Sequence, residues 1–386
     1  MDTFARQATI VRGRGSRVWD QKNNQYLDFT SGISVHNAGH CHPKIVDAIK
    51  SQAETLAHCS NLFYTPKNGL LAQRLSSMGL GGKVFFSNSG AEANETMVKM
   101  ARLYGNKDGR YEIICMKGSF HGRTLGMISA TGQSKVQTGF DPLLPGFRFA
   151  DFNDLESVKA LVNDHTVAIM LEAVQGEGGI NPATPEFMQG VRNLCNEKGL
   201  LMLCDEIQCG LGRTGKMFGF DHYGVKPDAC TLGKSIGGGL PMGVLLATPE
   251  CSGIFTPGSH GTTMGGNPLA CASALAFLDV YAEERLADHS EKYGELFKQG
   301  LQKFVEDYDE VLEIRGIGLM LGLVMKGSAQ DVVDELRAGG LLALTAGEHV
   351  VRLLPPLNIT DSDLEEGIEM IGDTFDIMFG EDADEE

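Results

Sequence analysis

Between about residue 83 and about residue 248, short uninterrupted apolar runs alternate with longer amphipathic stretches. The runs cover residues 84–86, 113–115, 167–171, 200–204 and 244–247. Strands that are apolar on both faces and separated by helical crossovers are typical of parallel sheets covered by helices on both sides. The pattern therefore predicts an α/β fold with a mostly parallel central sheet.

The pattern changes after about residue 254. A helical stretch over residues 270–281 and a charged helix near residues 291–308 precede two apolar runs, at 319–324 and 350–354. This mixture predicts a smaller α+β domain that shares the amino-terminal segment. We expect a large domain over residues 44–252, a small domain from residues 1–43 and 253–386, and a disordered acidic tail at 380–386.

Composition narrows the class of protein. The 386 residues are 42% hydrophobic and 22% charged, which is ordinary for a globular protein, and no apolar stretch approaches the ~20 residues of a membrane span. The net charge of −17 argues against nucleic acid as a partner. The nine cysteines form no CxxC pair and the amino terminus carries no secretory or transit pattern, so we expect reduced thiols and a cytoplasmic location.

The segment Ser87-Asn-Ser-Gly-Ala-Glu-Ala-Asn94 runs from a predicted strand into a predicted helix. Backbone amides near Gly90 and Ala91 would point at an anion that the helix dipole favours. The segment therefore indicates a phosphate site, and the alternative is a plain serine cap on an ordinary turn.

A lysine and an acid complete the candidate chemistry. Asp205 follows the apolar run at 200–204, and Lys234 precedes three consecutive glycines that suit a tight turn or a close approach. Pyridoxal phosphate needs an amine that forms a Schiff base with its aldehyde and a carboxylate that keeps its pyridine nitrogen protonated. Lys234 and Asp205 could supply these two services, whereas a lysine in isolation is usually solvated.

Three other motifs resemble known binding motifs, but their spacing does not fit a dinucleotide, nucleotide-phosphate or metal site. Gly210-Leu-Gly-Arg-Thr-Gly215 matches G-x-G-x-x-G, but it begins five residues after Asp205, whereas a dinucleotide-binding turn opens a helix directly and carries its acid ~20 residues later. Gly233-Lys-Ser235 resembles the end of a phosphate-binding loop, but Asp228 stands where that motif needs glycine. His40-Cys-His42 has no second cluster to complete a metal site, so we predict a loop there and no metal.

Taken together, these segments resemble the class III aminotransferases of pyridoxal-phosphate fold type I, and within that class the members acting on acetylornithine. The likeness covers nearly the whole chain. Its motifs include Gly39-His-Cys-His-Pro43, Asn61-Leu-Phe-Tyr-Thr65, Phe85 to Asn94, Ser119-Phe-His-Gly-Arg-Thr124, Gln175-Gly-Glu-Gly-Gly179, Asp205-Glu-Ile-Gln208, Gly212-Arg-Thr-Gly215, His260-Gly-Thr-Thr263 and Arg352-Leu-Leu-Pro-Pro356. The stretch from Thr231 to Lys234 is also similar to glutamate-1-semialdehyde aminomutase.

The resemblance implies a cofactor site for pyridoxal 5'-phosphate. Lys234 would be the Schiff-base lysine and the proton-transferring base, and Asp205 would hold the pyridinium proton. The remaining implied contacts are Gln208 to the phenolic oxygen, Ile207 and Phe120 on the two ring faces, Ser89, Gly90 and Ala91 at the phosphate, and Thr263 from a partner subunit. A homodimer is therefore expected.

The resemblance also implies how two substrates share one pocket. Arg123 would bind a distal carboxylate, and Arg352 would bind the carboxylate on the reacting carbon of glutamate. When the reacting carbon is a bare CH2, a carboxylate should cover Arg352; Glu177 is our candidate, with Glu172 second. Thr262 would contact the acylated substrate, and Ile33, where related ornithine enzymes place a tyrosine, disfavours free ornithine.

We therefore expect an enzyme of arginine biosynthesis that converts N2-acetyl-L-ornithine and 2-oxoglutarate to N-acetyl-L-glutamate 5-semialdehyde and L-glutamate. Succinyldiaminopimelate or succinylornithine could replace the acetylated donor without changing any residue named above. Ornithine or 4-aminobutyrate is a less favoured donor. A regulatory or scaffold protein that keeps the cofactor fold is the alternative outside the enzymes.

Overall fold

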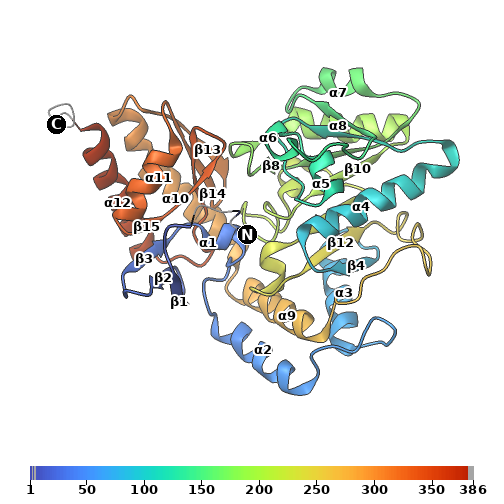
Figure 1. Ribbon diagram of the computed structural model, residues 1–386, viewed down its shortest axis with the longest axis horizontal. Helices are drawn as coiled ribbons and strands as arrows, with labels where there is room; N and C mark the ends of the chain where they lie inside the picture. Colours follow the sequence, from blue (N-terminus) through green and yellow to red (C-terminus); the bar gives the residue numbers. More distant parts are fainter. Residues whose placement is uncertain (2, 4–5, 381–386) are drawn as a thin grey trace.

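The computed structural model describes residue 1, residue 3 and residues 6–380, and most of the predicted acidic tail, residues 381–386, lies outside this part. Figure 1 shows two bodies. One holds the central sheet with its covering helices, and the other combines the amino-terminal strands with the carboxyl-terminal helices. The site described below lies at the carboxyl ends of central strands in the first body.

The central sheet has seven strands in the order β4-β12-β11-β10-β7-β5-β6. Strand β12 runs antiparallel to both of its neighbours, and the other neighbouring pairs are parallel. Along the chain the strands are β4 (Val84–Ser87), β5 (Glu112–Met116), β6 (Phe147–Ala150), β7 (Thr166–Glu172), β10 (Leu201–Asp205), β11 (Ala229–Leu232) and β12 (Gly243–Ala247).

The prediction of a mostly parallel, buried sheet is confirmed. Every residue of β7, β10, β11 and β12 is buried, as expected for strands covered on both faces. The five predicted runs became β4, β5, β7, β10 and β12. Strands β6 and β11 were not predicted, because Arg148 and Thr231 interrupt their short apolar patterns.

Helices and a small hairpin surround this sheet. They are α4 (Gly90–Gly105), η1 (Asn106–Asp108), α5 (Leu125–Ala130), α6 (Ser134–Gln137), α7 (Leu155–Leu161), β8 (Val174–Gln175), β9 (Asn181–Pro182), α8 (Pro185–Lys198), η2 (Gly219–Tyr223) and η3 (Lys234–Gly237). Helix α8 shows why they form: Thr184 caps its first turn, Pro185 follows, and Gly199 ends it with φ of 62°. Its buried face, which includes Phe187 and Val191, packs against the sheet.

Four further helices are α1 (Ser31–Ser34), α2 (Pro43–Thr55), α3 (Pro66–Met78) and α9 (Pro268–Glu283). Helix α9 is buried along most of its length and packs against α2, α3 and η3. A helix that is apolar nearly all round must be covered on several sides, which explains this central position. Figure 1 shows α9 above α2 in the lower part of the molecule.

The second body contains two four-stranded sheets with orders β1-β2-β3-β15 and β13-β14-β17-β16. Strand β3 pairs in parallel with β15, so the amino-terminal segment joins the carboxyl-terminal part. Its elements are β1 (Ile10–Arg14), β2 (Arg17–Asp20), β3 (Gln25–Asp28), α10 (Leu286–Asp307), β13 (Val311–Ile317), β14 (Met320–Met325), α11 (Ala329–Ala338), β15 (Leu341–Leu342), β16 (Leu344–Ala346), β17 (Val350–Leu353) and α12 (Asp361–Phe379). The domain boundaries at residues 43 and 252 stay a prediction.

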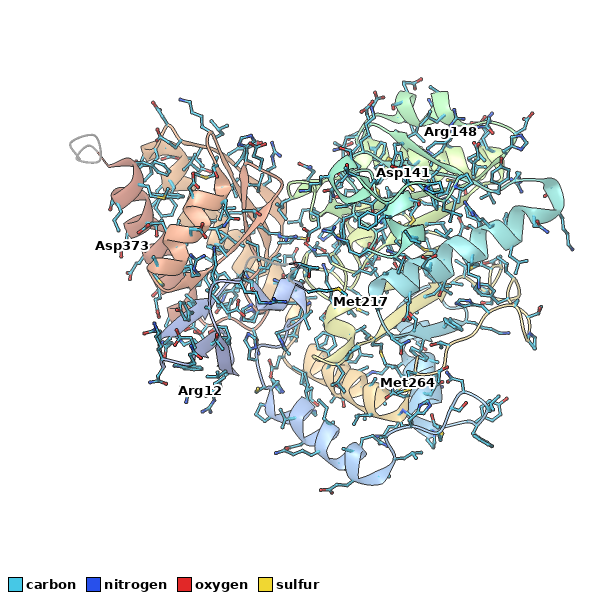
Figure 2. All side chains as sticks on the ribbon, viewed as in Figure 1. Arg12, Asp141, Arg148, Met217, Met264 and Asp373 are labelled. Carbon is cyan, nitrogen blue, oxygen red and sulfur yellow. The ribbon has the colours of Figure 1, made fainter. Side chains whose placement is uncertain are left out.

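Side chains fill the junction between the two bodies, where Figure 2 labels Met217. The main hydrophobic core runs through both bodies, from Phe86 in the central sheet to Phe375 in α12. Among the described residues, no helix is long and apolar enough to cross a membrane.

Candidate active site

A cavity of about 200 Å³ lies at the carboxyl ends of β7 and β10. Its walls bring together most of the residues that the sequence singled out, which arrive from five separate segments of the chain. The lining residues are Gly90, Ala91, Phe120, His121, Gly122, Glu172, Glu177, Asp205, Ile207, Gln208 and Lys234.

Asp205 is the last residue of β10 and is 3% exposed. Its Oδ2 accepts hydrogen bonds from Asn94 Nδ2 at 2.7 Å and from His121 Nδ1 at 2.8 Å, and its Oδ1 accepts one from the Ile207 amide at 3.0 Å. Thr231 Oγ1 in turn donates to Asn94 Oδ1 at 2.7 Å. A carboxylate held by this many donors has a fixed orientation and a stabilised negative charge.

His121 forms an ion pair with the Asp205 carboxylate. Burial alone would lower the pKa of His121, but the hydrogen bond and charge of Asp205, with the charge of Glu172, outweigh burial and raise that pKa. The other ring nitrogen, Nε2, is buried and has no hydrogen-bond partner. His121 and Asp205 therefore form a buried pair at the end of the strand, in which the carboxylate favours the charged form of the imidazole.

Asn94 and His121 were absent from the predicted site. Signals for both were present: His121 stands between Phe120 and Arg123 in a motif already singled out, and Asn94 lies one helical turn after Gly90 on α4. What the sequence could not supply was the long-range contact of both side chains with Asp205.

Lys234 begins η3 in the left-handed region, with φ of 50°. Gly238 ends that turn with φ of 57°, and a Cβ there would meet Ser273 Oγ at 2.7 Å, so glycine is required on both grounds. The Lys234 side chain is partly buried in the cavity wall, and burial, only partly offset by Glu177, lowers its pKa to about 8. A larger fraction of this amine is therefore uncharged at physiological pH than in an ordinary lysine, which favours action as a nucleophile or base.

At another wall of the cavity, helix α4 begins. Ser89 caps it by accepting a hydrogen bond from the Glu92 amide at 3.2 Å, while Glu92 Oε2 accepts one from the Asn88 amide at 2.6 Å. Gly90 lies against Ile207, since a Cβ on Gly90 would meet Ile207 Cδ1 at 2.9 Å. The first turn therefore presents free backbone amides and a helix dipole beside the cavity, which suits a phosphate.

An ion pair between Arg352 and the half-buried Glu177, which lines the cavity, lies behind the cavity wall. Arg352, from β17, is 2% exposed and donates from Nη1 to Glu177 Oε1 at 2.6 Å and to Gln208 Oε1 at 3.1 Å. Burial would raise the pKa of Glu177, but the charge and hydrogen bond of Arg352 outweigh it and lower that pKa. Arg352 Nε is left without a partner.

The second acid considered for that role is placed differently. Glu172 Oε2 accepts from the Phe120 amide at 3.1 Å, and Oε1 accepts from the Gly176 amide at 3.4 Å. Burial raises the pKa of Glu172 to about 7. Glu172 therefore supports the loop that carries Phe120, whereas Glu177 is the acid that contacts Arg352.

Six candidate residues do not line this cavity: Ser89 and Arg352, whose contacts are described above, and Arg123, Ile33, Thr262 and Thr263. Arg123 is exposed, with its guanidinium carbon 5.4 Å from the Phe120 ring centroid, and Ile33 lies on the left-handed turn α1. Thr262 and Thr263 line another hollow beside Asn88, where Thr262 Oγ1 accepts from Asn88 Nδ2 at 3.3 Å. Within one chain, these two threonines are separate from the Lys234 cavity.

The residues around the cavity fit pyridoxal phosphate. Phe120 and Ile207 offer two apolar surfaces for a flat ring, the anchored Asp205 carboxylate suits a pyridinium nitrogen, and the start of α4 suits the phosphate. Lys234 supplies an amine of lowered pKa in the same space. The cavity therefore offers a carboxylate where the pyridine nitrogen would lie and backbone amides where the phosphate would lie.

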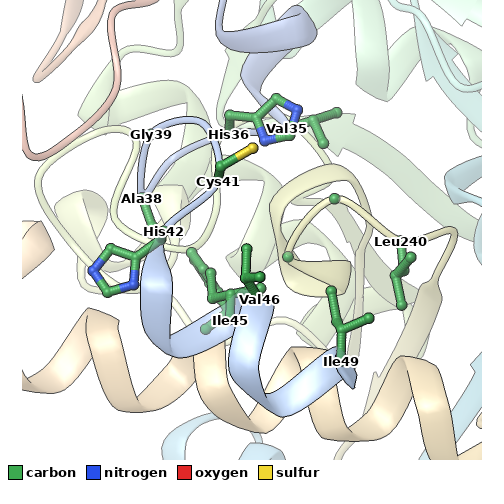
Figure 3. Close-up of a pocket in the computed structure, with 13 residues that line it drawn as sticks. Val35, His36, Ala38, Gly39, Cys41, His42, Ile45, Val46, Ile49 and Leu240 are labelled. Atoms are coloured by element: carbon green, nitrogen blue, oxygen red, sulfur yellow. The ribbon is translucent and has the colours of Figure 1, made fainter. Parts of the chain in front are cut away.

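A second cavity, of about 190 Å³, has mainly apolar walls. Figure 3 shows Ile45, Val46 and Ile49 of α2 on one side and Leu240 on the other. The neighbouring His40-Cys-His42 segment is a loop, in which His40 bonds Asp28 and His42 bonds Glu284. Over the described part of the chain, no group of three or more His, Cys, Asp or Glu side chains is placed to hold a metal ion.

Comparison with known proteins agrees with this geometry. The family "Aminotransferase class-III" matches residues 2–375. The acetylornithine aminotransferase of Caldanaerobacter subterraneus subsp. tengcongensis is 48% identical over 378 residues, covering 97% of this chain and 96% of the relative. The acetylornithine/succinyldiaminopimelate aminotransferase of Yersinia pestis is 46% identical, covering 93% and 90%.

A solved structure extends the comparison. The N-acetylornithine aminotransferase of Stenotrophomonas maltophilia K279a superposes with a TM-score of 0.84 at 37% identity, covering 96% of each chain. The predicted fold type I is thereby confirmed. From its sequence, its fold and the Lys234 cavity, the chain belongs to the class III aminotransferases, which use pyridoxal 5'-phosphate.

Proposed function

We propose that the protein is an acetylornithine aminotransferase, which transfers the δ-amino group of N2-acetyl-L-ornithine to 2-oxoglutarate in arginine biosynthesis. The observation that carries the proposal is the buried Arg352–Glu177 pair at 2.6 Å beside Lys234. The names of the relatives, acetylornithine aminotransferases among them, support the same substrate.

The Arg352–Glu177 pair accounts for two dissimilar amino donors. Acetylornithine reacts at a CH2 that carries no carboxylate, so Glu177 stays on Arg352 and neutralises it. Glutamate reacts at a carbon that carries a carboxylate, which takes the place of Glu177 on the guanidinium. One pocket thus accepts both donors without leaving a buried charge unpaired.

The distal ends of the two donors are alike. Each ends in a carboxylate, and Arg123 is exposed at the mouth near Phe120, where a bidentate pair can form without first breaking an ion pair. Thr262, which lies outside the cavity of its own chain, would contact the acyl group only from a partner subunit. At Ile33 the chain has no phenolic hydroxyl that could hold the free amino-acid end of ornithine.

Pyridoxal phosphate, when bound, supplies the electron sink that stabilises a carbanion on the reacting carbon. Asp205, which accepts hydrogen bonds from Asn94 and His121, would hold a proton on the pyridine nitrogen. Lys234, with a pKa of about 8, would be the base that accepts a proton from the reacting carbon of the substrate and donates it again. Phe120 and Ile207 would cover the two faces of the ring and exclude water.

The same proposal includes Ser89, Gly90 and Ala91 at the phosphate, Gln208 at the phenolic oxygen, a homodimer in which the partner's Thr263 completes the phosphate site, and a cytoplasmic location. The exposed position of Thr263 in a hollow beside α4 supports a role across an interface.

Co-expression of Lys234→Ala and Thr263→Ala chains tests whether the site is shared between two subunits. Hybrid dimers then contain one site with both native residues, and recovered activity is expected; a hybrid no more active than either parent contradicts a shared site.

The substrate is tested by single half-reactions followed through cofactor absorbance. Acetylornithine and glutamate should each convert the cofactor, while ornithine and 4-aminobutyrate should convert it slowly. Conversion with succinyldiaminopimelate as well would extend the donor class, as the name of the Yersinia pestis relative illustrates for that protein. If none of these amino donors converts the cofactor, the proposed enzymatic activity is contradicted and the scaffold alternative is favoured.

A further inference from the structure

One arginine outside the cavity is completely buried. Arg213 is 0% exposed and lies in the loop between β10 and η2. Its Nε donates to Ser34 Oγ at 3.0 Å and its Nη2 to Asn37 Oδ1 at 2.7 Å, while Nη1 donates to the carbonyls of Leu319 at 2.8 Å and Pro355 at 2.6 Å. All four of these acceptors are uncharged, and burial lowers the pKa of Arg213 to about 9.

The G-x-G-x-x-G motif builds the loop that carries this arginine. Gly212 and Gly215 have φ of 88° and 95°, and a Cβ on Gly212 would meet the Tyr281 ring at 2.9 Å. The glycines therefore serve a tight turn that faces Arg213 inward. The structure thereby explains a motif to which the sequence assigned no chemistry.

Arg213 reaches the amino-terminal segment at an unusual turn. Ser31, Gly32, Ile33 and Ser34 have φ of 46°, 63°, 63° and 61°, and left-handed backbone in three non-glycine residues is costly. Ser31 Oγ donates to the Leu354 carbonyl at 2.7 Å, and Ser34 Oγ accepts from Arg213. The turn is thus held between the Arg213 loop and the segment that follows Arg352.

The same arginine is linked to the lysine loop through Asn37. Asn37 accepts from Arg213 by Oδ1 and donates by Nδ2 to Ser235 Oγ at 3.2 Å. Ser235 directly follows Lys234, whose own φ is positive. On the other side, Pro355 stands three residues after Arg352. One guanidinium therefore joins the segments that carry Lys234, Arg352 and Ile33.

We propose that Arg213 is a positioning residue: its hydrogen bonds to Ser34, Asn37 and Pro355 hold the Lys234 loop, the Arg352 strand and the Ile33 turn in one fixed arrangement. The role rests on the proposed function, because it matters only if Lys234 and Arg352 act on one substrate. A planar group with five donors suits this task, since it can reach four partners from three segments at once. Lysine has three donors at one atom and could not span them.

The test uses substitutions that remove single partners of Arg213 and add no charge. Asn37→Ala breaks the link to Ser235, and Ser34→Ala breaks the link to the left-handed turn. Ser290→Ala is the matched control: buried Ser290 Oγ donates to the Arg213 carbonyl at 2.9 Å and accepts from the Leu319 amide at 3.1 Å, but it does not contact the guanidinium. Ser34→Ala and Ser290→Ala each lose two buried hydrogen bonds, and Asn37→Ala loses four, to Arg213, Ser34, Leu211 and Ser235.

The first measurement is amide hydrogen exchange in the protein without cofactor. Asn37→Ala should speed exchange of residues 233–238 by roughly fivefold to tenfold, the equivalent of one buried hydrogen bond. Ser34→Ala should speed amide exchange of residues 31–36, and Ser290→Ala should speed exchange only near residue 319. This readout needs no substrate, so it stands even if the proposed substrate is wrong.

The second measurement is steady-state kinetics with the cofactor bound. Misplaced reacting groups lower kcat more than KM, so Asn37→Ala should lower kcat about tenfold with KM within about twofold, whereas Ser290→Ala should leave both nearly unchanged. Arg213→Lys should lower kcat further. Unchanged exchange at 233–238 in Asn37→Ala, or equal kinetic losses in Asn37→Ala and Ser290→Ala, would overturn the positioning role.

Discussion

The two ends of the Lys234 cavity are built in different ways. At the pyridine end, Asp205 is buried and accepts hydrogen bonds from Asn94, His121 and the Ile207 amide. At the proposed substrate end, Arg123 is exposed outside the cavity beside Phe120, and Arg352 is paired with Glu177. A cofactor that remains bound calls for a preorganised partner, whereas two substrates that alternate call for groups that can change partners.

Removing the Lys234 amine should have the largest effect, because Lys234 is the proposed attachment point of the cofactor and the proposed base for the substrate. Lys234→Ala should lower transamination at least about 10³-fold, as expected when the proton-transferring base is lost. Cofactor should still bind through its phosphate and ring, measured by equilibrium dialysis. Lys44→Ala, at an exposed ion pair with Glu283, is the control and should keep full activity. Substantial residual turnover in Lys234→Ala would contradict the site.

Neutralising Asp205 tests the preorganised end alone. Asp205→Asn keeps the shape but removes the charge, so the pKa of His121 should fall below its present raised value. The rate should drop on the order of 10²-fold, since the lost charge stabilised the pyridinium. Histidine NMR and stopped-flow half-reactions check the two effects, with Asp228→Asn as a buried-contact control. A rate unchanged within twofold would count against the assignment.

The exchangeable end is tested by Glu177→Gln. Glutamine cannot neutralise Arg352, so kcat/KM for acetylornithine should fall about tenfold while that for glutamate stays within about twofold. The ratio of the two values isolates the effect from any general loss. Glu313→Gln, at an exposed ion pair with Arg315, should leave the ratio unchanged. Equal losses for both donors in Glu177→Gln would refute the switch.

The smallest expected effect concerns Glu206, the buried acid next to Asp205. It accepts from the amides of Gly219 and Phe220, yet burial raises its pKa from 4.5 to about 8. A raised carboxyl pKa contributes stability that is full below about pH 4.5 and is lost as the pH rises through about 8.

Urea unfolding of the cofactor-free protein between about pH 5 and about pH 8 checks this sign. Wild type should lose stability relative to Glu206→Gln as the pH rises over that window. Parallel stability curves for the two proteins would show that Glu206 does not titrate with a raised pKa.

Much of the sheet followed from local pattern. Apolar runs predicted β7 and β10, and the rule that sites lie beyond the carboxyl ends of parallel strands placed Asp205 correctly at the cavity. Lys234 was found by its glycines, which the tight η3 turn requires. The contacts of these residues are observed, while their catalytic roles stay predictions.

The remaining features depend on contacts between distant segments. His121 meets Asp205 across 84 positions and Arg213 meets Asn37 across 176, and no local pattern encodes such pairings. Strand β11 was missed because its pattern is too short without its neighbours. Thr263 lies outside the cavity of its own chain, so its predicted role needs a second subunit that sequence pattern alone cannot place.

The central claim is that Lys234 bonds covalently to pyridoxal phosphate within the cavity that Asp205 closes. Borohydride reduction of the cofactor-loaded protein, followed by peptide mass mapping, tests it most directly. The account predicts that the phosphopyridoxyl mass appears on the peptide containing Lys234. The mass should be absent from that peptide when acetylornithine is added before the reduction. Label on another lysine, or no label at all, would contradict it.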